Sequence, residues 1–251
     1  LSQVEDESVP TLLLGVEEPE LYQHPPQARH LASVLLKIAS GNSQVLVTTH
    51  SPYYTSGQNF ENVRMFRRGG DRSVVQTSAT FDAVAEIVAG VTGKTQIRPA
   101  GVRAKVHQAM MWSLAEMFFV NKVVFVEGPE DIAYLSQYLH AVDKLDELRA
   151  KGVGIVPTSS KSGMVQAVAI AKCLQIPHFA VWDSDGHERH VDRRAKHEAD
   201  NIALRKLFGC ADLTAFPDDD VFDTGFCTWK DEASARFEAD CNAHWVEIKN
   251  A

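Results

Sequence analysis

Apolar runs of strand length alternate with helical patterns along much of the chain, and they fall into two blocks. The first block has an apolar strand over 12–16, a helical pattern over about 28–39 and a second strand over 45–48. A β-hairpin is expected around the turn "GGD", with helical patterns over about 80–90 and 102–119 after it.

The second block repeats the alternation. It has a strand over 123–126, a helix that extends to about residue 149, a strand over 152–158, a helix over 163–174 and a strand from 178. Strands that alternate with helices in this way predict an α/β fold with a mainly parallel sheet flanked by helices.

Acidic residues follow two strands of the second block. One strand runs into Glu127 and another into Asp183 and Asp185, while Asp131 lies in the helix after Glu127. Parallel sheets place their sites at the carboxyl ends of strands, so these carboxylates converge if the strands are neighbours. The alternative is helix capping, because acidic first turns are common in helices.

A cluster of carboxylates indicates a particular chemistry. Uncompensated acids repel one another and take up protons unless a cation is present. Hard oxygen ligands suit Mg²⁺ or Mn²⁺, and a pair of such ions can stabilise the attacking and leaving oxygens of phosphodiester cleavage.

Composition narrows the class of protein. With 251 residues, 45% of them hydrophobic, the chain can bury a core as a soluble globular protein. The net charge of -8 argues against a protein whose whole surface binds nucleic acid, although it is compatible with a local phosphate-binding site. No apolar run reaches the roughly 18 residues of a membrane span, so no membrane association is expected.

The N-terminal segment and the cysteines bear on the cellular compartment of the protein. The first decapeptide, "LSQVEDESVP", lacks the features of a secretion signal, and the chain is expected to be a fragment. Widely spaced cysteines without a Cys-x-x-Cys pair favour reduced thiols and a cytoplasmic protein; they are Cys173, Cys210, Cys227 and Cys241.

The strand-end acids carry a resemblance to a known family. "VVFVEGPED" followed by "FAVWDSDG" resembles the Toprim fold of topoisomerases, primases and certain nucleases. This version looks like the OLD (overcoming lysogenization defect) family of ATP-dependent nucleases, which join an ABC-type ATPase to a Toprim nuclease. The resemblance implies catalytic acids at Glu127, Asp131, Asp183 and Asp185.

The first block is similar to the ATPase part of the same family. "LLLGVEEPELYQHP" resembles a Walker B strand, which makes Glu17 the magnesium-associated acid and Glu18 the water-activating acid. In "LVTTHSP", His50 matches the switch histidine that senses the γ-phosphate of ATP. Each fragment alone is weak, since strands ending in two acids are frequent.

A phosphate-binding loop is missing from the sequence. Such a loop needs Gly-x-x-x-x-Gly-Lys-Ser/Thr between a strand and a helix, and "GVTGKT" at 90–95 has the wrong spacing and follows a helical pattern. It is interpreted as a linker. The chain by itself should therefore not hydrolyse ATP, and ATP is a cofactor only of a full-length protein.

A short loop, "PTSSKSG", joins the second strand of the block to its helix. It resembles a Gly/Ser/Lys loop of the family, in which Ser159, Ser160 and the helix N-terminus could hold a phosphate while Lys161 supplies charge. An ordinary helix start capped by serine is the alternative.

Two further stretches concern metal and DNA. "ARFEADC" resembles a Phe-Glu motif that completes a second metal site, so that Glu238, and less surely Asp240, would join Asp131 there, with Glu127 and Asp183 at the first metal. The alternative is a solvated helix face. The basic segment "DGHERHVDRRAKH" favours contact with the DNA backbone over zinc binding.

The resemblance implies a metal-dependent DNA endonuclease that uses two Mg²⁺ or Mn²⁺ ions, with a homodimer formed through the ATPase part. The expected divisions are an ATPase part over 1–80, a helical linker over 81–120 and a Toprim domain over 121–251. Alternatives are another Toprim enzyme, such as a primase or topoisomerase, and a non-catalytic DNA-binding module controlled by nucleotide.

Overall fold

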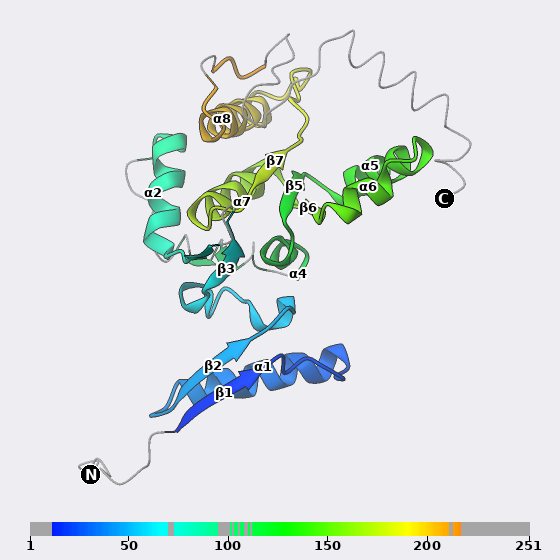
Figure 1. The fold of residues 1–251 in the computed structure, drawn as a ribbon. Coiled ribbons are helices and arrows are strands. Elements are labelled where there is room, and N and C mark those ends of the chain that lie inside the picture. Colours follow the sequence, from blue (N-terminus) through cyan, green and yellow to red (C-terminus); the bar gives the residue numbers. More distant parts are fainter. Residues whose placement is uncertain are drawn as a thin grey trace, which may run out of the picture. The chain divides into compact units, whose positions relative to one another are not determined.

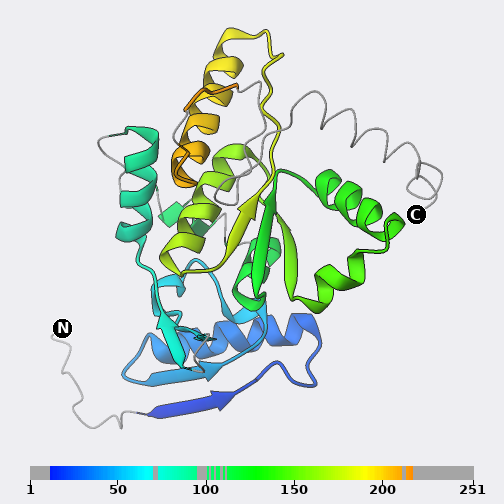
Figure 2. The same ribbon diagram turned by 45° about the horizontal axis from the view of Figure 1, so that its top comes forward.

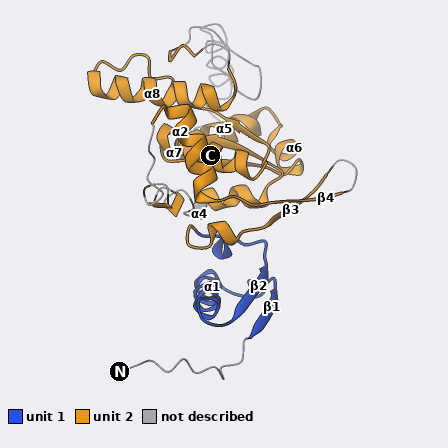
Figure 3. Cartoon of the chain, turned by 90° about the vertical axis from the view of Figure 1, so that its left-hand side faces the viewer, with its two compact units in different colours: residues 1–56 blue, residues 57–251 orange. Residues whose placement is uncertain are grey.

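The computed structural model describes residues 12–69, 73–94, 101, 103–104, 106–107, 110, 112–210 and 213–216. The chain forms two compact units, Leu1–Ser56 and Gly57–Ala251 (Figure 3). The domain boundaries expected at residues 80 and 120 follow from the family resemblance. The contact-based division into two units does not test them, so they stay a prediction.

The first unit is a strand, a helix and a strand. β1 (Leu13–Glu17) pairs in parallel with β2 (Gln44–Thr48), and α1 (Pro25–Ala39) covers one face of this two-stranded sheet. The helix begins about three residues earlier than its apolar pattern predicts. Prolines occupy its first positions, where the missing N–H has no partner to lose, and the backbone N–H of His24 donates to the side chain of Gln27.

The second unit is built on a three-stranded parallel sheet (Figure 1). β5 (Lys122–Val126) lies in the centre, between β6 (Val153–Pro157) and β7 (His178–Ala180). The strands before Glu127 and Asp183 are therefore neighbours, which is the condition under which their acids were expected to converge. β7 is shorter than predicted: it ends at Ala180, and Val181 adds one more bond from its N–H to the carbonyl of Phe125.

Helices cover both faces of this sheet (Figure 2). α7 (Lys161–Cys173) packs on β5 and β7, and α2 (Phe81–Thr92) and α8 (Val191–Leu207) pack on α7. α7 is thus enclosed on nearly all sides, which explains why its sequence is apolar around most of its circumference.

The helix predicted to extend to about residue 149 is two helices. α5 (Pro129–Ala141) packs on β5 and β6, and α6 (Leu145–Ala150) follows it after a turn. Asp143 adopts a left-handed backbone conformation, with φ of 56°, and this breaks the helical path. An aspartate accepts that conformation more readily than most residues.

The predicted hairpin is present and joins the second unit. β3 (Met65–Arg68) pairs in antiparallel fashion with β4 (Val74–Thr77). Thr77 donates its hydroxyl to the carbonyl of Leu174 at 2.9 Å, which ties the hairpin to the residue after α7. The short helices of this unit are η2 (Phe60–Asn62), α4 (Trp112–Ala115) and η3 (Glu116–Phe119), and η1 (Pro52–Tyr54) belongs to the first unit.

The "GVTGKT" stretch ends α2 and does not follow a strand. Gly93 is the left-handed C-cap of that helix, with φ of 68°. This position agrees with the interpretation that the stretch is not a phosphate-binding loop. Within the described part of the chain, no helix is both long enough and apolar enough to cross a membrane.

Candidate active site

Glu127 stands at the carboxyl end of the central strand of the sheet. Because β5 and β7 are parallel neighbours, the chain after β7 passes directly beside it. The backbone N–H of Asp183 donates to Glu127 Oε1 at 3.1 Å. The structure therefore brings together the two acids that the sequence placed at the ends of separate strands.

Asp131 lies in the first turn of α5, next to Glu127. Its Oδ2 accepts a hydrogen bond of 2.8 Å from the backbone N–H of Gly128, so it closes the turn between β5 and α5. Its negative charge also raises the pKa of Asp183, which shows that these carboxylates are close enough to interact. Asp131 thus caps the start of α5, as the alternative interpretation expected. It also lies at the acidic edge, the end of the sheet that carries Glu127, Asp131, Asp183 and Asp185.

Lys161 points into the same acidic edge from the start of α7. Its side chain is only 3% exposed, its Nζ lies 2.5 Å from Asp185 Oδ2, and it donates to the carbonyl oxygen of Asp183. A positive charge at a helix N-terminus is unfavourable, and burial adds a desolvation cost. The surrounding oxygens offset both costs, so Lys161 is an internal counter-charge for the acids.

The loop before α7 is a capped helix start. Ser160 Oγ accepts from the backbone N–H of Gly163 at 3.1 Å, in agreement with the capping alternative. A methyl group at Gly163 would collide with the carbonyl oxygen of Thr158, so the turn closes only around glycine. This tight turn fixes the direction in which Lys161 leaves the helix.

The carboxylate of Asp185 contacts two basic side chains, those of Lys161 and His197. The same oxygen that contacts Lys161 lies 3.1 Å from Nδ1 of His197, which projects from α8. The backbone of Asp185 is left-handed, with φ of 55°, and this turns the loop so that Asp185 faces Lys161. In the sequence, the segment that contains His197 was weighed for zinc binding and interpreted as a basic helix that contacts DNA.

The electrostatics of the edge follow from burial and crowding. Burial, with smaller contributions from the charges of Asp183 and Asp185, raises the pKa of Glu127 to about 7, and Lys161 and the hydrogen bond from Asp183 oppose the rise. Burial likewise raises the pKa of Asp183, with help from Asp131 and Asp185. Acids that resist ionisation in this way are stabilised by an added cation.

The donor set fits a hard divalent cation, chiefly through Glu127 and Asp183. The backbone N–H of Asp183 contacts the Glu127 carboxylate, the two acids follow neighbouring strands, and the pKa of each is raised. Across the described ranges, no group of three or more His, Cys, Asp or Glu side chains is already gathered around one point. Asp185 is engaged by Lys161, and Glu238 and Asp240 lie outside the described residues.

Asn201 is a residue of this site that the sequence interpretation missed. It lies on α8, is 1% exposed, and bonds to the loop that carries the acids. A signal was available, because Asn201 falls one turn before Leu204 on the apolar stripe of α8, where a polar residue requires a buried partner. Its neighbour Asp200 accepts from Ser162 Oγ at 2.6 Å, which also joins α8 to the start of α7.

The first unit holds a second polar cluster at the ends of β1 and β2. His50 Nε2 lies 3.3 Å from Glu18 Oε1, so the predicted water-activating acid and the predicted switch histidine are neighbours. Glu17, the predicted magnesium-associated acid, is the exposed last residue of β1. Glu18 has a left-handed backbone, with φ of 42°, as the chain leaves the strand.

Glu20 was not singled out in the sequence, yet it fastens this cluster. Its Oε1 accepts a hydrogen bond of 2.8 Å from Thr49 Oγ1 and one of 2.7 Å from the backbone N–H of His50. It therefore holds the end of β2 against the chain after β1 and sets the backbone of His50. The residues present fit the reacting end of a nucleotide, but the sequence has no glycine-rich cradle for its phosphates.

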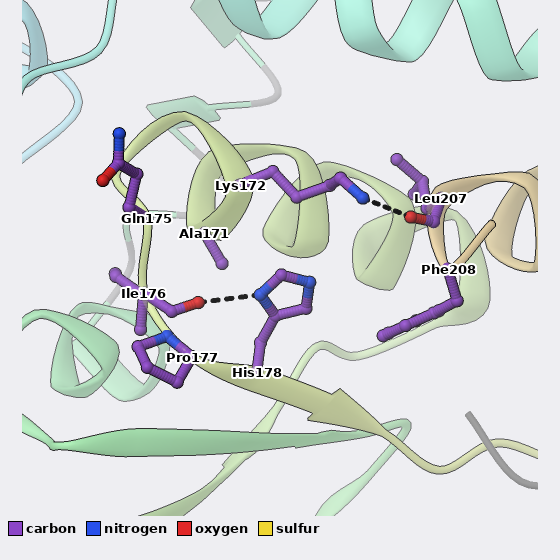
Figure 4. Close-up of a pocket in the computed structure, with 8 residues that line it drawn as sticks. All are labelled: Ala171, Lys172, Gln175, Ile176, Pro177, His178, Leu207 and Phe208. Carbon is purple, nitrogen blue, oxygen red and sulfur yellow. Dashed lines mark hydrogen bonds between the residues drawn. The ribbon is translucent and has the colours of Figure 1, made fainter. Parts of the chain in front are cut away.

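A separate pocket of about 500 Å³ lies at the other end of β7 (Figure 4). Its lining includes His178, whose Nδ1 lies 2.7 Å from the carbonyl oxygen of Ile176, and Lys172, which donates to the carbonyl of Leu207. Burial lowers the pKa of His178. Because His178 begins β7 and Asp183 follows its end, this pocket is distinct from the acidic edge.

Comparison with known proteins gives matches in both units. Residues 2–55 match a family model described as an AAA ATPase domain. Residues 118–185 match one described as the overcoming lysogenization defect protein-like TOPRIM domain. The second match includes Glu127, Lys161 and both aspartates after β7.

Two curated proteins are similar over most of the chain. An OLD nuclease of Thermus scotoductus is 26% identical over 184 residues, which are 73% of this chain and 32% of that protein. Endonuclease GajA of Bacillus cereus is 25% identical over 191 residues, 69% of this chain and 26% of that protein. The chain thus spans about a third and about a quarter of these relatives. The chain is similar to nucleases of the OLD family, and its residues 118–185 match the Toprim domain of that family.

Proposed function

We propose that the acidic edge of the second unit is the centre of a metal-dependent DNA endonuclease. The observation that carries the proposal is the meeting of Glu127 and Asp183 at one sheet edge with a buried lysine beside them. Both similar proteins are named as nucleases, one of them as an endonuclease, which supports the same reaction class.

Glu127 and Asp183 would hold the first ion, which is Mg²⁺ or Mn²⁺. Asp131, together with Glu238 and Asp240, would hold the second. Such ions, when bound, supply an activated water and stabilise the leaving oxygen of a phosphodiester. Asp185 would act through Lys161, because its carboxylate contacts the ammonium and holds it at the acidic edge.

Lys161 contributes charge where a phosphodiester would approach. Its buried ammonium partly offsets the mutual repulsion of the acids, and it lowers the pKa of both Glu127 and Asp183. It therefore favours the ionised carboxylates that metal binding requires. A positive group close to the reacting phosphate also stabilises the charge that develops during cleavage.

The first unit would belong to an ATPase that controls the nuclease in a full-length protein. The pairing of Glu18 with His50 supports this role, and Glu17 would be the magnesium-associated acid. A homodimer through the ATPase part and a cytoplasmic location complete the proposal; both derive from the family resemblance and the composition.

Cleavage of supercoiled plasmid by the purified chain tests the proposed function. With Mn²⁺ present, the chain should convert supercoiled DNA to nicked or linear DNA, and Glu127→Ala or Asp183→Ala should reduce the rate by at least about a hundredfold. Asp131→Ala should also cut more slowly, because it would lose the second ion.

Glu130→Ala is the matched control for this experiment. Glu130 is an exposed acid in the same first turn of α5, adjacent to Asp131, and it should keep the parental rate. If all three cluster variants cut as fast as Glu130→Ala, the acids are helix caps and the endonuclease proposal is wrong. That result would favour a non-catalytic module.

A further inference from the structure

Asn201 is a fully buried amide that contacts four residues around the acidic site. Its Nδ2 donates to the carbonyl oxygen of Ser184 at 2.8 Å and to that of Ala215 at 3.0 Å. Its Oδ1 accepts from Trp182 Nε1 at 3.1 Å and lies 3.5 Å from Lys161 Nζ. One side chain thus satisfies groups on the loop after β7, on a later segment and on α7.

These bonds flank the acids on both sides. Trp182 directly precedes Asp183, and Ser184 lies between Asp183 and Asp185. An amide that holds both positions fixes the path of the backbone through Asp183. Asp183 in turn directs its own N–H at Glu127 Oε1.

The chemistry of asparagine suits this place better than other residues do. A carboxylate could accept from Trp182 but could not donate to the two carbonyl oxygens. An apolar side chain of equal size would remove the bonds that Asn201 makes to the two carbonyl oxygens and to the indole N–H. The bonding pattern therefore requires both halves of the amide.

We propose that Asn201 is a positioning residue for the nuclease centre, which aligns the Asp183–Asp185 loop and the Lys161 ammonium with Glu127. This inference rests on the proposed function for its catalytic consequence. Its structural part can be measured without catalysis. Residues that orient ligands commonly change metal affinity or activity about 10- to 100-fold when they are replaced.

The test uses hydrogen exchange of the metal-free chain, because the Asp183 amide reports directly on the alignment. That amide should exchange about tenfold faster in Asn201→Leu and Asn201→Asp, since its contact with Glu127 depends on the loop path. Asn201→Asp keeps the size and the acceptor oxygen, loses the two donated bonds and adds a negative charge beside Lys161. It decides the test alone if Asn201→Leu does not fold.

Thr77→Val is the matched control. It also removes one buried bond from a side chain to a backbone carbonyl in the same unit, but at Leu174 and away from the acids. Its Asp183 amide should exchange at the parental rate. Unchanged exchange in the Asn201 variants, or equal acceleration in Thr77→Val, would overturn the positioning role.

Plasmid cleavage supplies the catalytic readout. The Mn²⁺ concentration for half-maximal nicking should rise about tenfold in Asn201→Asp and stay unchanged in Thr77→Val. A parent chain that does not cut DNA would count against the proposed function, while the exchange rates would still decide whether Asn201 aligns the loop. A parent that cuts, with an unchanged Mn²⁺ requirement in Asn201→Asp, would overturn the inference.

Discussion

At the acidic edge, the pKa values of single carboxyl groups depend strongly on the residues around them. Glu127 and Asp183 are ordinary carboxyl groups whose pKa values are raised by burial and by one another. Lys161 limits this rise, and Asp185 keeps Lys161 in place. The balance leaves Glu127 close to half-ionised near neutral pH, so its protonation state and cation binding are coupled.

The raised pKa of Glu127 predicts how stability depends on pH. The group has an ordinary pKa of 4.5 and a folded-state pKa of about 7, so the folded protein binds the proton more tightly. Its stabilising effect is complete below about pH 4.5 and is lost as pH rises through 7. After allowance for partial exposure, the loss is about 1 kcal/mol, or about 2–4 °C in melting temperature.

Thermal unfolding in metal-free buffer between pH 5 and pH 8.5 measures this effect. Glu127→Gln should remove that part of the decline, because glutamine does not titrate. Mn²⁺ should raise the melting temperature of the parent more at pH 8 than at pH 5.5, since the ion needs the ionised carboxylate. A parent and a Glu127→Gln variant with identical pH profiles would contradict the assigned pKa.

At the scale of elements, the strands were predictable and the contacts between helices were not. The apolar run before Glu127 and the one before Asp183 are short and end at acids, so the sequence indicated two parallel strands but left open whether they are neighbours. The end of β7 at Ala180 depends on where β5 stops offering partners, which is a property of the pair.

The missed role of Asn201 and the unpredicted contact of His197 with Asp185 share one cause. Asn201 and His197 reach the acids only because α8 packs across the start of α7, and a contact of this range has no local pattern. A seventeen-residue helix with many charges is read from sequence as solvated. Only the position of Asn201 on the stripe with Leu204 hinted at burial.

The turn that starts α7 gives a prediction at this scale. Gly163→Ala should destabilise the protein by about 1–3 kcal/mol and reduce cleavage, because the new methyl group must push the turn and Lys161 away from the carbonyl oxygen of Thr158. Urea unfolding and plasmid nicking measure the two effects.

Gly90→Ala in α2 is the control for that substitution. A methyl group there meets no atom within 4 Å, and alanine favours a helix interior by about 0.5–1 kcal/mol relative to glycine. It should therefore stabilise the chain slightly and keep the parental cleavage rate. Equal stability losses for Gly163→Ala and Gly90→Ala would refute the steric argument.

The whole molecule joins two units whose sequence patterns belong to different chemistries. The first matches an AAA ATPase domain and pairs Glu18 with His50, and the second matches the OLD-like Toprim domain over residues 118–185. The sequence indicated both assignments because each rests on residues that follow a strand. The boundary between the units at Ser56 and Gly57 depends on packing, and no residue pattern in the sequence indicates it.

The purified chain should show no ATP turnover. Glu18 and His50 can act on water and on a γ-phosphate, but the sequence lacks the glycine loop and lysine that hold a triphosphate. Phosphate release from ATP should equal that of Glu18→Gln, at the level of the buffer. Robust turnover that Glu18→Gln abolishes would contradict this prediction.

Crystals of the chain grown with Mn²⁺ test the central claim most directly, because the anomalous signal of manganese locates the ion. An ion bonded to the carboxylates of Glu127 and Asp183 is the predicted result, and Glu127→Ala crystals should lose it. Manganese found only elsewhere, at a concentration that supports plasmid cleavage, would contradict the assignment of this acidic edge as the nuclease centre.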